Sequence, residues 1–126
     1  MKILILSADL PFEISDLIRE NLINVGYEEV MVFSNPFIAR HYLNQEPNTP
    51  CIIFDYNMKD TGLDVSSYLS ELLAAFPALR MVIVVWEEES VLERFTIHPI
   101  VCKRDSEFCD KLIHQVNRLA AKASKE

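Results

Sequence analysis

The stretch "CIIFDYNMKDTG" (51–62) joins four apolar residues to an acid, Asp55, and then to a polar turn that contains Gly62. The apolar part is continuous, whereas a strand with one exposed face alternates between apolar and polar residues. A short continuous run of this kind is typical of a strand covered on both faces in a parallel sheet. We therefore expect Asp55 to lie at the carboxyl end of a buried strand.

Four other runs of the same type occur along the chain. They are "KILIL" (2–6), "EVMVF" (29–33), "RMVIVVW" (80–86) and "PIVC" (99–102). Helical periods separate them, most clearly at 65–76, where apolar residues recur every third or fourth position. A first helix should end at Gly26, and a second, about 36–45, begins behind Ser34 and Asn35. Asp105 or Ser106 is placed to cap the last helix, and a fourth helix within "EEESVLERF" (87–95) is weakly periodic.

This alternation of strand and helix predicts an α/β fold: a five-stranded, doubly wound parallel sheet of flavodoxin-like order 2-1-3-4-5, with helices on both faces. The 126 residues suit a single domain over 1–126, with a frayed tail from about 121. Ligands of such folds bind at the carboxyl ends of the strands.

Composition excludes several classes of function. The net charge is −7 and the densest basic cluster is the pair Lys103 and Arg104, so we expect no nucleic-acid partner. The longest apolar run, 81–86, is too short to cross a membrane, and the N-terminus lacks a signal-peptide core, so we expect a cytoplasmic protein. Two glycines, Gly26 and Gly62, cannot form a P-loop or a dinucleotide-binding GxGxxG.

The three cysteines are odd in number and share no CxxC spacing. This spacing argues against a zinc site or a disulfide framework, and we expect Cys51, Cys102 and Cys109 to be buried, reduced thiols.

Three polar residues are expected at the same edge of the sheet. Asp55 ends the third strand, Lys103 follows the fifth, and Asp9 lies just past the first. Two carboxylates can hold Mg²⁺, and a lysine opposite them can offset the charge of a transferred phosphoryl group. Each residue taken singly also fits an ordinary solvated strand end.

Over nearly its full length the chain resembles the receiver domain of two-component response regulators. The resemblance rests on "KILIL", "DYNM" (55–58), Gly62, "MVIVV" (81–85) and "CK" (102–103). It implies that Asp55 is the residue phosphorylated by a histidine kinase and that Lys103 contacts the phosphoryl group. It also implies a Mg²⁺ ligand at the backbone carbonyl of Asn57, beside the carboxylates of Asp55 and Asp9.

Several residues depart from the receiver pattern. The family has two consecutive acids after the first strand, where this chain has Ser7 and Ala8, or Ala8 and Asp9 if the strand is one residue longer. Trp86 replaces a Ser or Thr whose hydroxyl follows the phosphoryl group, and it cannot copy that hydroxyl. The remaining degenerate positions are Glu87, in place of a small residue, and Ile100, in place of an aromatic switch residue. We therefore expect a weak Mg²⁺ site or none, and no other cofactor.

Three functions stay open. The first, which we favour, is a stand-alone atypical receiver, or pseudo-receiver, that signals through protein contacts, is not an enzyme, and shows weak or absent phosphorylation at Asp55. The second is a working phosphoacceptor that uses Asp55 and Mg²⁺. The third is a flavodoxin-like small-ligand protein, although "SADLP" (7–11) has little of the phosphate-binding loop that a flavin needs.

The partner is expected to be a protein, either a histidine kinase or a downstream signalling protein, and the oligomeric state is open. The resemblance implies that this protein contacts its partner through the surface formed by the fourth helix, fifth strand and fifth helix. Residues expected there are Leu92, Phe95, Ile97, His98, Lys111 and Arg118. Leu92 and Phe95 equally suit a role in covering the sheet.

Overall fold

The computed structural model describes residues 2–7, 12–46, 50–56, 64–86, 95 and 97–125, with the backbone alone for 12–14 and 122–125. In chain order the elements are β1 (Ile3–Leu6), α1 (Phe12–Asn24), β2 (Val30–Phe33), α2 (Pro36–Gln45), β3 (Cys51–Asp55), α3 (Val65–Ala75), β4 (Met81–Val85), β5 (Ile100–Cys102) and α4 (Phe108–Lys125).

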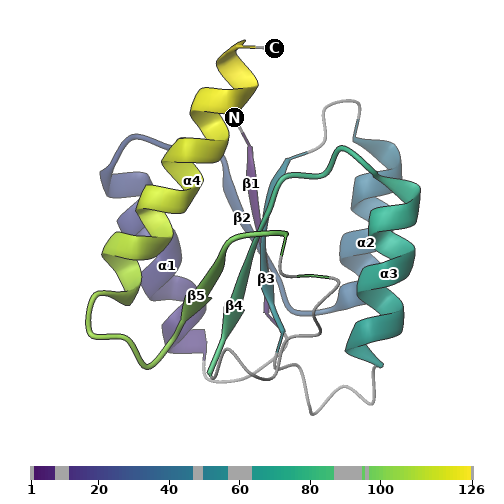
Figure 1. The fold of residues 1–126 in the computed structure, drawn as a ribbon, viewed down its shortest axis with the longest axis horizontal. Helices are drawn as coiled ribbons and strands as arrows, with labels where there is room; N and C mark the ends of the chain where they lie inside the picture. The colour runs from purple at the N-terminus through teal and green to yellow at the C-terminus, as the bar shows by residue number, and fades with distance from the viewer. Residues whose placement is uncertain are drawn as a thin grey trace.

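The five strands form one parallel sheet of order β2-β1-β3-β4-β5, which confirms the predicted topology. Figure 1 shows α1 and α4 on one face of the sheet and α2 and α3 on the other. The carboxyl ends of all five strands therefore meet at one edge, where β3 lies between β1 and β4.

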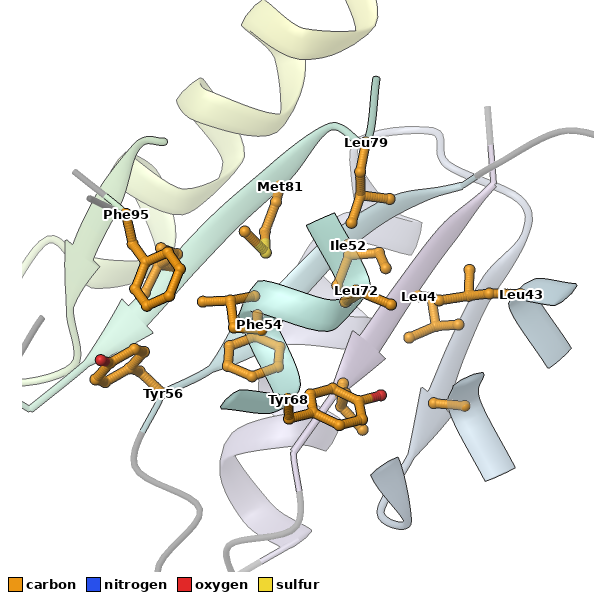
Figure 2. Close-up of a cluster of buried hydrophobic side chains, with 14 of the residues drawn as sticks. Leu4, Leu43, Ile52, Phe54, Tyr56, Tyr68, Leu72, Leu79, Met81 and Phe95 are labelled. Carbon is orange, nitrogen blue, oxygen red and sulfur yellow. The ribbon is translucent and has the colours of Figure 1, made fainter. Parts of the chain in front are cut away.

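The strands are buried on both faces, and this explains their continuous apolar sequences. In β1, Leu4 and Leu6 pack toward α2 and α3, while Ile3 and Ile5 pack toward α1 and α4. Figure 2 shows the first of these clusters, in which the Phe54 and Tyr68 rings stack with centroids 6.1 Å apart. Since each strand residue meets a covering helix layer, a polar residue inside a strand would be desolvated.

Local signals in the sequence position the helix ends. The Asn35 side chain accepts hydrogen bonds from the backbone N–H groups of Phe37 and Ile38, and this caps α2 as expected. After α1, Gly26 adopts φ +108°, and the backbone N–H of Tyr27 donates to the carbonyl of Leu22. This is the Schellman closure that the glycine predicted.

The start of the last helix differs from its prediction. The Asp105 carboxylate accepts from the backbone N–H of Glu107, so it organises the turn before α4 instead of capping the first turn of the helix. The helix is drawn to Lys125, and fraying of the tail from about 121 stays a prediction.

Other predictions have mixed outcomes. All three cysteines are free, but only Cys51 is buried, while Cys102 and Cys109 are half-buried. The fourth helix expected within 87–95 lies outside the described residues, except for Phe95. No helix in the described part of the chain is both long enough and apolar enough to cross a membrane.

Candidate functional site

Asp55 and Lys103 meet at the carboxyl edge of the sheet. Backbone hydrogen bonds fix both against β4: the N–H of Tyr56 donates to the carbonyl of Val84, and the N–H of Lys103 donates to that of Val85. The Lys103 Nζ lies 2.8 Å from Asp55 Oδ1, and the two side chains are 4% and 6% exposed. The strand order predicted this proximity, and the structure adds that the pair is buried.

Ser7 occupies the second oxygen of the same carboxylate. It follows β1, where its backbone N–H donates to the carbonyl of Phe33 at 3.0 Å, and its Oγ donates to Asp55 Oδ2 at 3.0 Å. From the sequence, Ser7 was noted only as a position where an acid is missing. The signal for its contact was available, because β1 and β3 are neighbours in the predicted sheet, Asp55 ends β3 and Ser7 directly follows β1.

Trp86 covers the lysine of this pair. It follows β4, and the Lys103 Nζ lies 4.9 Å from the centroid of its ring. An ammonium at this distance from an indole face forms a cation–π interaction. Trp86 is itself 37% exposed, whereas the Lys103 side chain is 4% exposed. This contact was not foreseen from the sequence.

The remaining degenerate positions fall into two groups. Ile100 begins β5 opposite Ile83 and packs, partly buried, against the core on the side of α2 and α3. Ala8 and Glu87 lie outside the described residues, as do the expected magnesium ligands Asp9 and Asn57.

The described residues do not by themselves form a magnesium site. Within the described part of the chain no three His, Cys, Asp or Glu residues are grouped to hold a metal ion. Asp55 is the one expected ligand that is described, and the Lys103 ammonium beside it repels a divalent cation. Ser7, Asp55 and Lys103 also border a void of about 10 Å³, whose other lining residues, Ile5, Leu6, Ile18, Ile53 and Val84, belong to the buried core.

The expected partner surface is reduced by burial. Phe95 is 2% exposed and lies edge-on to Tyr56, with ring centroids 6.3 Å apart, as Figure 2 shows. It therefore covers the sheet and does not face a partner, which confirms the second of the two roles expected for it. His98 is half-buried, while Ile97, at 84%, is the most exposed large apolar residue of the described part.

The two basic residues expected on this surface, Lys111 and Arg118, are exposed on α4. Lys111 forms an ion pair with Asp105. Leu92 lies outside the described residues.

Comparison with known proteins gives similar folds but no close relative. No protein-family model matches the sequence, and no curated protein matches it significantly. Among solved structures, a CheY-like response regulator receiver domain protein from Methanospirillum hungatei JF-1 has a TM-score of 0.75 at 16% identity, covering 98% of this chain and 96% of that one. The BeF3-activated conformation of SdrG from Pseudomonas melonis Fr1 has a TM-score of 0.70 at 20% identity, covering 91% and 94%.

A longer solved structure shows the same likeness. RcsB from Salmonella enterica serovar Typhimurium, solved bound to promoter rprA in the presence of phosphomimetic BeF3-, has a TM-score of 0.71 at 19% identity, covering 99% of this chain and 67% of that one. At these identities the comparisons establish the fold: the chain has the fold of response-regulator receiver domains.

Proposed function

We propose that this protein is an atypical receiver module that signals through protein contacts, with weak or absent phosphorylation at Asp55 and no enzymatic activity of its own. The observation that carries the proposal is the set of contacts that the described residues make around Asp55. Lys103 and Ser7 each hold one carboxylate oxygen, and Trp86 covers the lysine.

These contacts oppose phosphorylation. A carboxylate attacks through one of its oxygens, and both Asp55 oxygens already accept hydrogen bonds, one from Lys103 and one from Ser7. Each bond draws negative charge away from the oxygen that would attack, and rearranging either bond to admit a phosphoryl group loses a contact that stabilises the resting state.

One observation favours a second function, that of a working phosphoacceptor. The Lys103 ammonium lies 2.8 Å from the Asp55 carboxylate, where it could offset negative charge on a phosphoryl group. Under this alternative Asp9 and Asn57 complete a weak Mg²⁺ site, and Trp86 swings aside on phosphorylation.

The partner in either case is proposed to be a protein, and not a nucleic acid or a membrane. Ile97 and Arg118, exposed beside β5 and on α4, are the described residues that best suit the contact surface. The free thiols of Cys51, Cys102 and Cys109 support a reducing, cytoplasmic location.

Intact-mass measurement tests the proposal. The protein is incubated with acetyl phosphate and millimolar Mg²⁺, beside Asp55→Asn as the variant without an acceptor. We expect no phosphoprotein from either, and no change in Trp86 fluorescence on addition of Mg²⁺ with beryllofluoride. Stoichiometric phosphorylation of the wild type that is lost in Asp55→Asn would refute the proposal and establish the second function.

Two further variants locate the cause of any block. Ser7→Ala releases one carboxylate oxygen, and Trp86→Ser uncovers the lysine. If the contacts described above oppose phosphorylation, these variants together should accept phosphate faster than the wild type. Equal and negligible labelling of all variants would instead place the cause in the missing acids after β1.

A further inference from the structure

A pocket of about 460 Å³ lies at the opposite end of the sheet from Asp55. Its walls come from the residues that precede β4, the residues that precede β5, and one face of α4. Arg80 stands immediately before β4, which then runs for five residues to Val85 at the Asp55 edge. At about 3.3 Å per strand residue, the two sites are roughly 15 Å apart or more.

Every ionisable side chain among the described residues that line this pocket is basic. Arg80, His98 and Arg118 contribute the charge or the capacity for it, and no Asp or Glu is among these described lining residues. Burial lowers the pKa of His98, so at neutral pH the two guanidinium groups carry the positive charge. The chain as a whole has a net charge of −7, so this is a local reversal of sign.

The two arginines are not neutralised by neighbouring acids. Within the described part of the chain, neither Arg80 nor Arg118 forms an ion pair; the ion pairs found there involve Lys2, Lys103 and Lys111. Arg118 Nη1 has one long hydrogen bond, at 3.4 Å, to Gln115 Oε1. Most of the donors on both guanidinium groups therefore stay available to a ligand.

A neighbouring pocket provides a contrast within the same protein. It measures about 520 Å³ and lies along β5, but Asp105 and Asp110 line it together with Lys111. Its two acids outnumber its one lysine, so size alone does not distinguish the two pockets. The arrangement of charge does.

The geometry also limits the class of anion. We propose that this basic pocket binds an organic phosphate monoester, with the phosphate held by Arg80 and Arg118 and an apolar body against Ile97 and Leu119. Guanidinium groups match phosphate oxygens with paired N–H donors, and two of them balance a dianion. A volume of 460 Å³ exceeds what a bare phosphate fills and falls in the range of small-molecule sites. Ile97 is 84% exposed, so an apolar ligand group that covers it removes apolar surface from water, and this favours binding.

A titration followed by ¹H–¹⁵N NMR tests this inference with three probes: phenyl phosphate, inorganic phosphate and phenol. We expect saturable binding of phenyl phosphate, about tenfold tighter than that of inorganic phosphate, and no saturable binding of phenol. Amide shifts should concentrate at 79–81, 97–98 and 115–119. Equal affinity for the two phosphates would overturn the apolar half of the site, and shifts centred on Asp55 and Lys103 would overturn its location.

Matched charge removals complete the test. Arg80→Gln and Arg118→Gln should each weaken the affinity for phenyl phosphate by about tenfold. Arg40→Gln removes the same charge from α2, on the other face of the sheet, and should leave this affinity unchanged. Asp55→Asn should also bind as the wild type does, which separates this pocket from the site around Asp55. Absence of saturable binding to the wild type, or equal weakening by Arg40→Gln, would refute the proposal.

Discussion

Replacing Lys103 with Met should destabilise this fold strongly, because it leaves the Asp55 carboxylate buried beside an apolar side chain. The two charges are 2.8 Å apart, and at an effective dielectric constant of about 20 the attraction is roughly 6 kcal/mol. The cost of desolvating both groups offsets most of this attraction in the wild type. Removing one partner keeps the desolvation of the other, so we expect Lys103→Met to cost about 3–5 kcal/mol of unfolding free energy.

The double variant Asp55→Asn/Lys103→Met separates an unpaired charge from a simple loss of packing. Its amide is neutral and can still accept a hydrogen bond from Ser7 Oγ. We therefore expect the double variant to recover about half or more of the stability lost in Lys103→Met. Lys111→Met is the matched control, because it removes a lysine from an exposed ion pair with Asp105 and should change stability little.

Urea denaturation followed by far-ultraviolet circular dichroism is the suitable assay. Trp86 fluorescence is unsuitable here because its ring contacts Lys103 directly. For a domain of this size, 3–5 kcal/mol corresponds to a fall in Tm of roughly 10–20 °C. A loss below about 1 kcal/mol in Lys103→Met, or a double variant no more stable than that single variant, would refute the description of a dry ion pair.

Two other predictions concern the core and a helix end. Burial raises the pKa of Cys51 from near 9 to about 12, so the stability that the neutral thiol contributes is complete below pH 9 and is lost as the pH rises from 9 toward 12. Between pH 8 and pH 10, the free energy of unfolding measured with urea should therefore fall by about 1 kcal/mol more for the wild type than for Cys51→Ala. Equal decreases in the two proteins would contradict this. Gly26→Ala should cost about 1 kcal/mol because φ is +108° while no atom lies within 4 Å of the added Cβ, and Gly26→Asn should cost less. A higher Tm for Gly26→Ala than for Gly26→Asn in thermal melts would show that backbone strain is not the cause.

The topology could be predicted because the apolar sequence of each strand indicates that the strand is buried on both faces. Runs such as "CIIF" and "MVIVV" need cover on both faces, and only a parallel sheet between helix layers provides it at this chain length. Helix ends with a single dominant signal, Asn35 and Gly26, were also placed correctly. Asp105 was misplaced because three polar residues precede α4 and side-chain capping does not choose among them by sequence alone.

The site was predictable as a neighbourhood and not as a set of contacts. Strand order alone brings Asp55 and Lys103 to one edge, whatever their rotamers. The bond from Ser7 to Asp55 and the position of Trp86 over Lys103 depend on which way short and long side chains turn at the strand ends. Comparison of Ser7 and Trp86 with the residues they replace shows which chemical group is absent at each position. It does not show which contact the new side chain makes.

The shortness of the outer strands has a consequence for self-association. β2 and β5 form the two edges of the sheet and have four and three residues. An edge strand offers alternate backbone groups to a neighbouring chain, so each of these edges presents very few hydrogen-bonding groups. Growth of the sheet by strand addition between copies is therefore disfavoured, and copies that associate should do so through helix surfaces.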